Sequence, residues 1–135
     1  MNIGNLHRRW QEVMPQVYDK ATRIVCLDII SETITEHDGE ETVEKAGYSF
    51  IPVEIDEQID YGHIKSQLIE AGFAQKDEFG ILMNAVNSIL EAASTASSWA
   101  KFKENLDTDD VAKFSDFMQF RAMCAEAAKE VMRAY

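Results

Sequence analysis

Three histidines are the residues of this sequence whose chemistry most readily serves metal binding or proton transfer. His7, His37 and His63 lie far apart in the chain. None belongs to a motif such as His-Glu-x-x-His, which places two ligands on one face of a helix. Solvated surface side chains are the expected role of all three, and the sequence therefore predicts no transition-metal site.

A short acidic segment could hold a hard cation through its carboxylate oxygens. It consists of His37, Asp38, Gly39, Glu40 and Glu41. Asp-Gly is also a dipeptide that favours tight turns, because glycine readily adopts positive φ angles. We interpret these five residues as the exposed tip of a β-hairpin.

A second acidic cluster, Asp107-Thr-Asp-Asp110, superficially has the pattern of a calcium-binding loop. Such a loop needs glycine at its sixth position and glutamate at its twelfth, where this chain has Ala112 and Met118. Capping of a helix explains the cluster better. The sequence also has no Gly-x-Ser-x-Gly or Gly-rich phosphate-binding motif. We expect no catalytic residues, no metal and no cofactor.

The charge distribution excludes some classes of partner. The chain has 135 residues and a formal net charge of −11, and residues 37–60 account for −7 with eight acids and one lysine. Arg8-Arg9 is the only basic doublet. Direct binding of nucleic acid, which requires clustered lysine and arginine, is therefore not expected. An acidic protein can instead occupy a basic nucleic-acid-binding partner.

The two cysteines, Cys26 and Cys124, lie in apolar segments without a further cysteine or histidine at ligand spacing. We expect buried free thiols, as in proteins of a reducing compartment. No apolar run approaches the roughly 20 residues that span a membrane, and the chain does not begin with a signal-peptide pattern. These features predict a cytoplasmic protein that does not enter a membrane.

Residues 22–55 predict a long antiparallel β-hairpin, and the rest of the chain is expected to be arranged around it. β-Branched residues are dense in residues 22–35, and aromatic and aliphatic residues alternate in residues 48–55. Pro52 cannot donate a hydrogen bond, so its strand needs an open edge or a bulge at that point. Because a two-stranded ribbon is unstable alone in water, helices must cover one of its faces.

Apolar residues at helical spacing predict the helices. The spacing of Leu6, Trp10 and Val13 predicts a short N-terminal helix that ends before Pro15. Beyond the hairpin, a helix capped by Asp60 is expected over residues 61–71, with Gly72 as a left-handed stop. Further helices are expected over residues 75–93 and about 107–133. Between them, Trp99 and Phe102 are expected to anchor a short helical turn in the core.

A chain of this length predicts one domain with one core. The expected fold class is α+β, with a long antiparallel hairpin or small sheet packed by three to four helices. Residues 1–21 should supply the N-terminal helix and a connector, residues 22–55 the hairpin, and residues 60–135 the helical part.

The last predicted helix carries two adjacent apolar stripes, whereas a helix packed on one side needs only one. The second stripe contains Phe117, Phe120, Cys124, Ala127 and Val131. The extra width indicates either a helix buried on both flanks or a surface for another chain. For the second case the candidate interface residues are Phe117, Phe120 and Met123, with Arg121 at the rim.

The order of features from Tyr48 onward resembles small uncharacterised proteins encoded among the structural genes of tailed bacteriophages and prophages, notably those of gut Bacteroidales. The resemblance lies in a strand, a helix and a closing helix with an aromatic-Arg centre. The matching segments are Tyr48-Ser-Phe-Ile-Pro-Val-Glu-Ile, Asp60-Tyr-Gly-His-Ile-Lys-Ser-Gln-Leu-Ile-Glu-Ala-Gly-Phe and Phe117-Met-Gln-Phe-Arg-Ala-Met-Cys-Ala-Glu-Ala-Ala-Lys-Glu-Val. This resemblance implies a virion or assembly role inside a bacterial host, and no catalytic motif accompanies it.

These observations favour a non-enzymatic protein that works by protein-protein contact, as a phage virion or assembly component. Its partners would be copies of itself, in a homo-oligomer, or other phage proteins. The alternatives are an acidic inhibitor or decoy of a basic nucleic-acid-binding partner, and a small enzyme or ligand-binding domain. A decoy should present carboxylates in rows at phosphate-like spacing, whereas a structural subunit should present an apolar patch.

Overall fold

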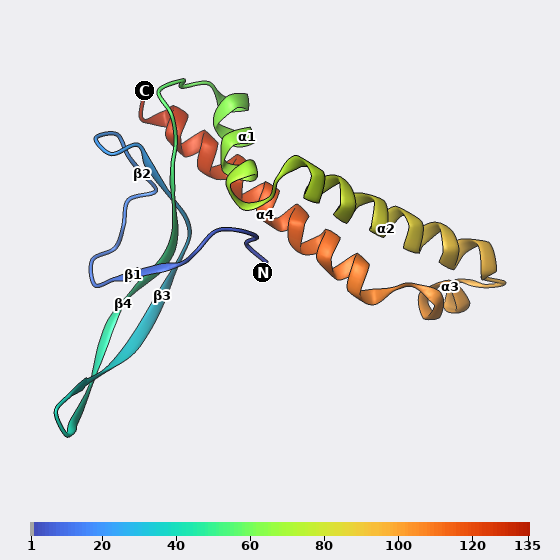
Figure 1. Cartoon of the computed structure of the whole chain (residues 1–135), viewed down its shortest axis with the longest axis horizontal. Coiled ribbons are helices and arrows are strands. Elements are labelled where there is room, and N and C mark those ends of the chain that lie inside the picture. Colours follow the sequence, from blue (N-terminus) through green and yellow to red (C-terminus); the bar gives the residue numbers. More distant parts are fainter. Residues whose placement is uncertain (1) are drawn as a thin grey trace.

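The computed structural model, which describes residues 2–135, has an α+β fold in which a long β-hairpin forms the two central strands of the sheet (Figure 1). The antiparallel sheet has the order β1-β4-β3-β2. Its strands are β1 (Arg9–Gln11), β2 (Tyr18–Asp19), β3 (Ile24–Asp38) and β4 (Glu41–Glu54). The helices are α1 (Tyr61–Gly72), α2 (Gln75–Thr95), α3 (Trp99–Asn105) and α4 (Thr108–Arg133). The predicted fold class is confirmed.

The hairpin pairs β3 with β4 from Ile24 opposite Glu54 to Asp38 opposite Glu41. Gly39 follows Asp38 with a φ of 66°, a value that suits glycine because it has no Cβ. The tight turn that the Asp-Gly dipeptide predicts is therefore present, and residues 37–41 are exposed at its tip. Their placement at the end of the hairpin agrees with the sequence.

A bulge interrupts β3 close to the body of the protein. Leu27 lies opposite Ile51 and Ile30 opposite Ser49, so Asp28 and its neighbour face a single residue of β4. Asp28 has a φ of 47°, which is uncommon for a residue other than glycine. Arg8 holds this bend by donating to the Asp28 carbonyl (3.2 Å) and by pairing with its carboxylate. The bulge thus ties the N-terminal segment across the sheet.

Pro52 lies at an open edge, as the sequence predicts. It faces Cys26, whose N–H points away from β4 and donates to the Val17 carbonyl (2.8 Å). In an antiparallel ladder the nitrogen of Pro52 must then point to the opposite side. On that side β1 pairs with β4 only as far as Phe50, which lies opposite Arg9, so β1 does not reach Pro52. No ladder hydrogen bond is lost.

The core lies between one face of the sheet and helices α1 and α4. The sheet contributes Val25, Leu27, Ile51 and Val53, which are all buried. The helices contribute Ile64, Leu68, Phe117, Phe120 and Val131. Phe73, which follows α1, packs its ring edge-on against the rings of Phe117 and Phe120, with centroid distances of 5.1 and 5.2 Å.

The predicted N-terminal helix is wrong, because residues 9–11 form the edge strand β1. Trp10 pairs with Ser49, and its indole N–H donates to the Glu32 carbonyl (2.9 Å). A Cβ on Gly47 would lie 2.4 Å from the Trp10 ring, so the ring rests directly on the glycine backbone. Ladder hydrogen bonds and aromatic burial on the sheet outweigh the helical spacing. The predicted connector likewise contains the short strand β2.

Helix α1 begins where the sequence predicts, but its terminal glycine, Gly72, is needed for a different reason from the one predicted. Asp60 caps the helix by accepting the N–H of His63 at 3.2 Å. Gly72 is the last residue of α1, yet its φ is not positive, so the predicted left-handed stop is wrong. A Cβ there would lie 2.7 Å from the Phe120 ring and 3.2 Å from the Ile3 carbonyl. Glycine is needed for this close approach.

Two projections leave the body in different directions (Figure 1). The helical arm, residues 75–118, consists of α2, α3 and the first part of α4. At 1.5 Å per residue, α2 alone is about 32 Å long. The ribbon, residues 32–47, is the outer part of the hairpin, where β3 and β4 have no further strand beside them. The arm and the ribbon are the parts of the molecule that other chains can reach most easily.

Two helical glycines should respond oppositely to alanine. Gly72→Ala forces the new methyl group against the buried Phe120 ring and should lower the free energy of unfolding by about 1–3 kcal/mol. Gly80, in α2, has no atom within 4 Å of an added Cβ, so Gly80→Ala should raise stability by up to about 1 kcal/mol. Urea unfolding checks both, and equal effects would contradict the packing at Gly72.

The tip of the ribbon should exchange its amide hydrogens faster than the rest of the sheet. Residues 36–44 are exposed and lie beyond the helices that cover the sheet. Few apolar contacts oppose local opening there. Hydrogen exchange followed by mass spectrometry of the isolated protein measures this. Slow exchange across residues 36–44 would mean that another chain covers the tip.

Candidate functional site

The interface residues that the sequence predicts on the last helix lie mostly in the core. Phe117 and Phe120 are only 4% and 0% exposed, so the prediction that they form a surface for another chain is wrong. The alternative, burial of the helix on both flanks, is the correct one, because α4 packs against both α1 and the sheet. Met123 packs partly buried against the same core. Arg121 is half exposed and pairs with Glu78 of α2 at 3.2 Å.

A row of exposed large apolar residues lies instead on α2. Phe79 and Leu90 are 65% and 61% exposed, and the residues between them on the same side are 37–45% exposed. We call this set the apolar stripe. It consists of Phe79, Leu82, Met83, Val86, Ile89 and Leu90.

A different side of α2 packs against α4. Ala85, Ser88 and Ala92 are buried there, and the Ser88 hydroxyl donates to the Asp110 carboxylate at 3.0 Å. With 3.6 residues per turn, the apolar stripe lies roughly 120° around the helix from these small side chains. The contact within the arm therefore uses small residues, and it leaves the large apolar ones in water.

The apolar stripe has the spacing and the charge pattern of a helix-helix interface. Phe79, Leu82, Val86, Ile89 and Ala93 follow one another at intervals of three, four, three and four residues, the repeat of a coiled-coil seam. Between Phe79 and Thr95 the only charged residue is Glu91. Exposed helices that face only water normally carry many charges, whereas the centres of interfaces are depleted of them.

The stripe continues into a groove at the base of the arm and reaches an aromatic pair at its tip. The groove has a volume of about 440 Å³ and lies between α2 and α4, lined by Phe79, Leu82, Phe114, Phe117 and Met118, with Glu78 and Arg121 among its polar residues. At the tip, Trp99 is 68% exposed and stacks on Phe102 with centroids 5.2 Å apart. Trp99 and Ala93 line the same shallow depression.

The sequence locates α2 and its apolar positions correctly but misplaces their partner. The sequence predicts that the helices after the hairpin cover one of its faces, and that Trp99 and Phe102 anchor a helical turn in the core. The first prediction is wrong for α2, which extends beyond the sheet, and the second is wrong for Trp99, which is largely exposed. The charge-free run after Glu78 is the signal in the sequence that could have identified this surface.

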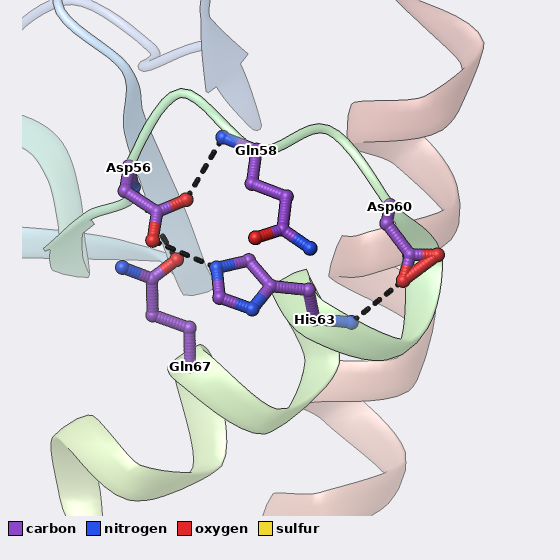
Figure 2. Close-up of polar contacts among 5 residues, drawn as sticks. All are labelled: Asp56, Gln58, Asp60, His63 and Gln67. Atoms are coloured by element: carbon purple, nitrogen blue, oxygen red, sulfur yellow. Dashed lines mark hydrogen bonds and ion pairs between the residues drawn. The ribbon is translucent and has the colours of Figure 1, made fainter.

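A polar cluster joins the end of β4 to the first turns of α1 (Figure 2). The Asp56 carboxylate accepts hydrogen bonds from the Gln58 N–H (3.0 Å) and from His63 Nε2 (2.7 Å). The Asp56 N–H donates to the Gln67 side chain at 3.3 Å. The hydrogen bond from His63 is the main cause that lowers the pKa of Asp56 below its usual 3.8. Since these bonds connect the linker to the helix, the histidine-aspartate pair serves to position α1.

The two cysteines are buried free thiols, as the sequence predicts. Burial raises the pKa of Cys124 to about 12 and raises that of Cys26 as well. Only the thiolate is a good nucleophile, so both thiols are poorly reactive in the folded protein.

The residues that were considered for metal binding do not gather in space. Within residues 2–135, no group of three or more histidine, cysteine, aspartate or glutamate side chains is arranged to hold a metal ion. In the same part of the chain, no helix has both the length and the apolarity to cross a membrane. Comparison with protein-family models, curated proteins and solved structures gives no match to this chain.

The hydrogen bonds of Asp56 should make stability depend on pH in a defined direction. Because the pKa of Asp56 is lowered by folding, its ionised form stabilises the folded protein above pH 3.8, and this contribution is lost as the pH falls through the lower folded value. Asp56→Asn should therefore reduce the melting temperature at neutral pH, with the difference closing below pH 3.8.

Thermal unfolding of the wild type and Asp56→Asn across this pH range measures the difference. Glu40→Gln, which removes a carboxylate at the exposed hairpin tip, is the matched control and should behave like the wild type. An Asp56→Asn defect of constant size down to strong acid would show that the charge of Asp56 is not the cause.

Proposed function

We propose that this protein is not an enzyme and works by binding other protein chains, through the apolar stripe, as a structural or assembly component. The observation that carries the proposal is the exposure of the stripe: six large apolar residues on one side of α2 are 37–65% exposed. Exposed apolar patches of this extent mark interaction sites in soluble proteins.

The distribution of charge supports the same proposal. An apolar patch is the property expected of a structural subunit, whereas a decoy of a nucleic-acid-binding protein should present carboxylates in rows. The acids of the ribbon are interrupted by Lys45, whose Nζ lies 2.9 Å from a Glu36 oxygen and 3.6 Å from a Glu12 oxygen. An acidic surface that includes its own lysine is a weak imitation of a phosphate backbone.

The setting of this activity is, in our proposal, a tailed phage or prophage, as a component of the virion or of its assembly in the bacterial host. The resemblance from Tyr48 onward to small proteins encoded among phage structural genes supports it. A shape with two projections also suits a subunit that contacts several neighbours, because each projection offers a surface remote from the core.

The size of the native assembly tests this proposal. In its natural host, the wild-type protein should sediment in a particle much heavier than the 15.3 kDa chain. Leu82→Glu combined with Ile89→Glu puts two charges into the stripe and should release the protein from the particle. The substituted side chains are exposed, so stability should change by no more than about 0.5 kcal/mol each.

A matched control adds the same charges to the same helix outside the stripe. Asn84→Glu combined with Asn87→Glu alters two exposed positions on another side of α2 and should leave the protein in the particle. If the wild type sediments as a free chain in its natural host, a role as a structural or assembly component is excluded. If both double variants are released equally, the stripe is not the contact surface.

A further inference from the structure

We infer that the partner of the apolar stripe is the stripe of a second copy of this chain, and that two helical arms pack antiparallel into a four-helix bundle. The inference rests on the proposal that the stripe is a contact surface, and it adds the identity of the partner. Two-helix hairpins with one open apolar side are the halves from which such bundles are built. A twofold dimer uses the same patch on both chains, as a single stripe requires.

The antiparallel direction follows from the positions of the groove and of Trp99. In an antiparallel pair, residues near the base of one arm lie beside residues near the tip of the other arm. Trp99 lies beside Ala93, and the groove lies beside Leu82. If the Trp99 ring enters the groove of the partner, Leu82 lies at the level of Ala93 of the second copy.

The same register aligns the whole seam. When Leu82 of one copy lies opposite Ala93 of the other, the twofold axis passes midway between these two positions along the helix. Val86 of one copy then lies opposite Ile89 of the other. The seam positions of one helix then meet those of the other along the stripe, as in antiparallel coiled coils. The Trp99 ring, which is 68% exposed in one chain, and the apolar groove of the other chain cover each other in the pair.

The area of the patch is sufficient for a specific dimer. A side chain of this size exposes about 200 Å² when it is free, so the stripe with Met118 and Trp99 leaves roughly 800 Å² open on one chain. Two chains together can therefore bury roughly 1,600 Å², within the range of stable protein interfaces.

Electrostatic repulsion also favours this arrangement over a parallel one. Each chain carries a formal charge of −11, and −7 of it lies in residues 37–60, on the ribbon and the linker before α1. Parallel arms would bring these two acidic regions side by side. Antiparallel arms place the two bodies at opposite ends of the bundle, with the nearly uncharged stripes between them.

The mass of the purified protein tests whether the partner is a second copy. Light scattering over about a hundred-fold range of concentration should give about twice 15.3 kDa at the upper end. Leu82→Glu with Ile89→Glu should weaken the dimer by at least about 100-fold, because it buries unpaired charges. Asn84→Glu with Asn87→Glu should leave the dimer intact. Circular dichroism of each variant confirms that it is folded.

Disulfide trapping tests the direction and the register. Leu82→Cys mixed with Ala93→Cys should give a cross-linked dimer, whereas each variant alone should not. In the proposed register two copies of position 82 are separated by about 16 Å along the axis, well beyond the 7 Å that a disulfide spans. The native Cys26 and Cys124 are buried and provide an unreactive background.

Three results would overturn the inference. A wild type that stays at 15.3 kDa at all concentrations excludes the second copy as partner. A dimer that both double variants retain lies elsewhere on the molecule. Self-cross-linking of Leu82→Cys and of Ala93→Cys alone indicates parallel arms.

A purified monomer that still enters a heavy particle in its host would refute only this inference, whereas a purified dimer without a particle would refute only the assembly role.

Discussion

Three segments that are distant in the sequence meet at Gly72, and the arrangement of the molecule depends on this contact. The Phe120 ring of α4 lies 2.7 Å from the position that a Cβ of Gly72 would take, and the Gly72 carbonyl accepts the N–H of Asn5 at 2.8 Å. Phe73 then turns its ring against Phe117 and Phe120. A larger residue at position 72 would separate α1 from α4 and both from the N-terminal segment. The direction in which α2 leaves the body is set at this junction, because α2 begins three residues later.

Helix α4 has two roles along its length. This division explains why its wide apolar surface led to a wrong interface prediction from the sequence. Its second half lies between α1 and the sheet, where Phe120, Cys124 and Val131 are completely buried. Its first half leaves the sheet and supports α2 through small residues and the Ser88–Asp110 hydrogen bond. The apolar stripe of α4 that contains Phe117, Phe120, Cys124, Ala127 and Val131 is therefore buried within the protein itself. Most of the apolar surface that remains open belongs to the neighbouring helix α2.

Much of the fold could be predicted because its signals are local. The Asp-Gly turn, the cap at Asp60, the acidic start of α4 and the buried thiols each depend on residues close together in the sequence. The predictions were wrong where the structure depends on contacts between residues that are far apart in the sequence. Trp10 forms an edge strand because Gly47 and the Glu32 carbonyl receive its ring, and Gly72 is needed because Phe120 lies against it. The candidate surface was assigned to the wrong helix for the same reason: periodicity identifies apolar sides of α2 and α4 but not which of them the core can reach.

The ribbon exposes mainly charged residues to water, whereas the helical arm exposes an apolar side. This difference favours association through the arm. The ribbon has open strand edges, which in many proteins invite pairing with another chain. Here those strands carry Glu32, Glu36, Glu41 and Glu44, so an edge-to-edge contact between two copies would bring like charges together. Trp10 and Lys45 further hold the base of the ribbon to its own chain. The helical arm has no such protection, because its exposed side is apolar and almost free of charge. Removing that side from water is favourable at about 25 cal/mol per Å², whereas removing the ribbon from water would require burying unpaired carboxylates.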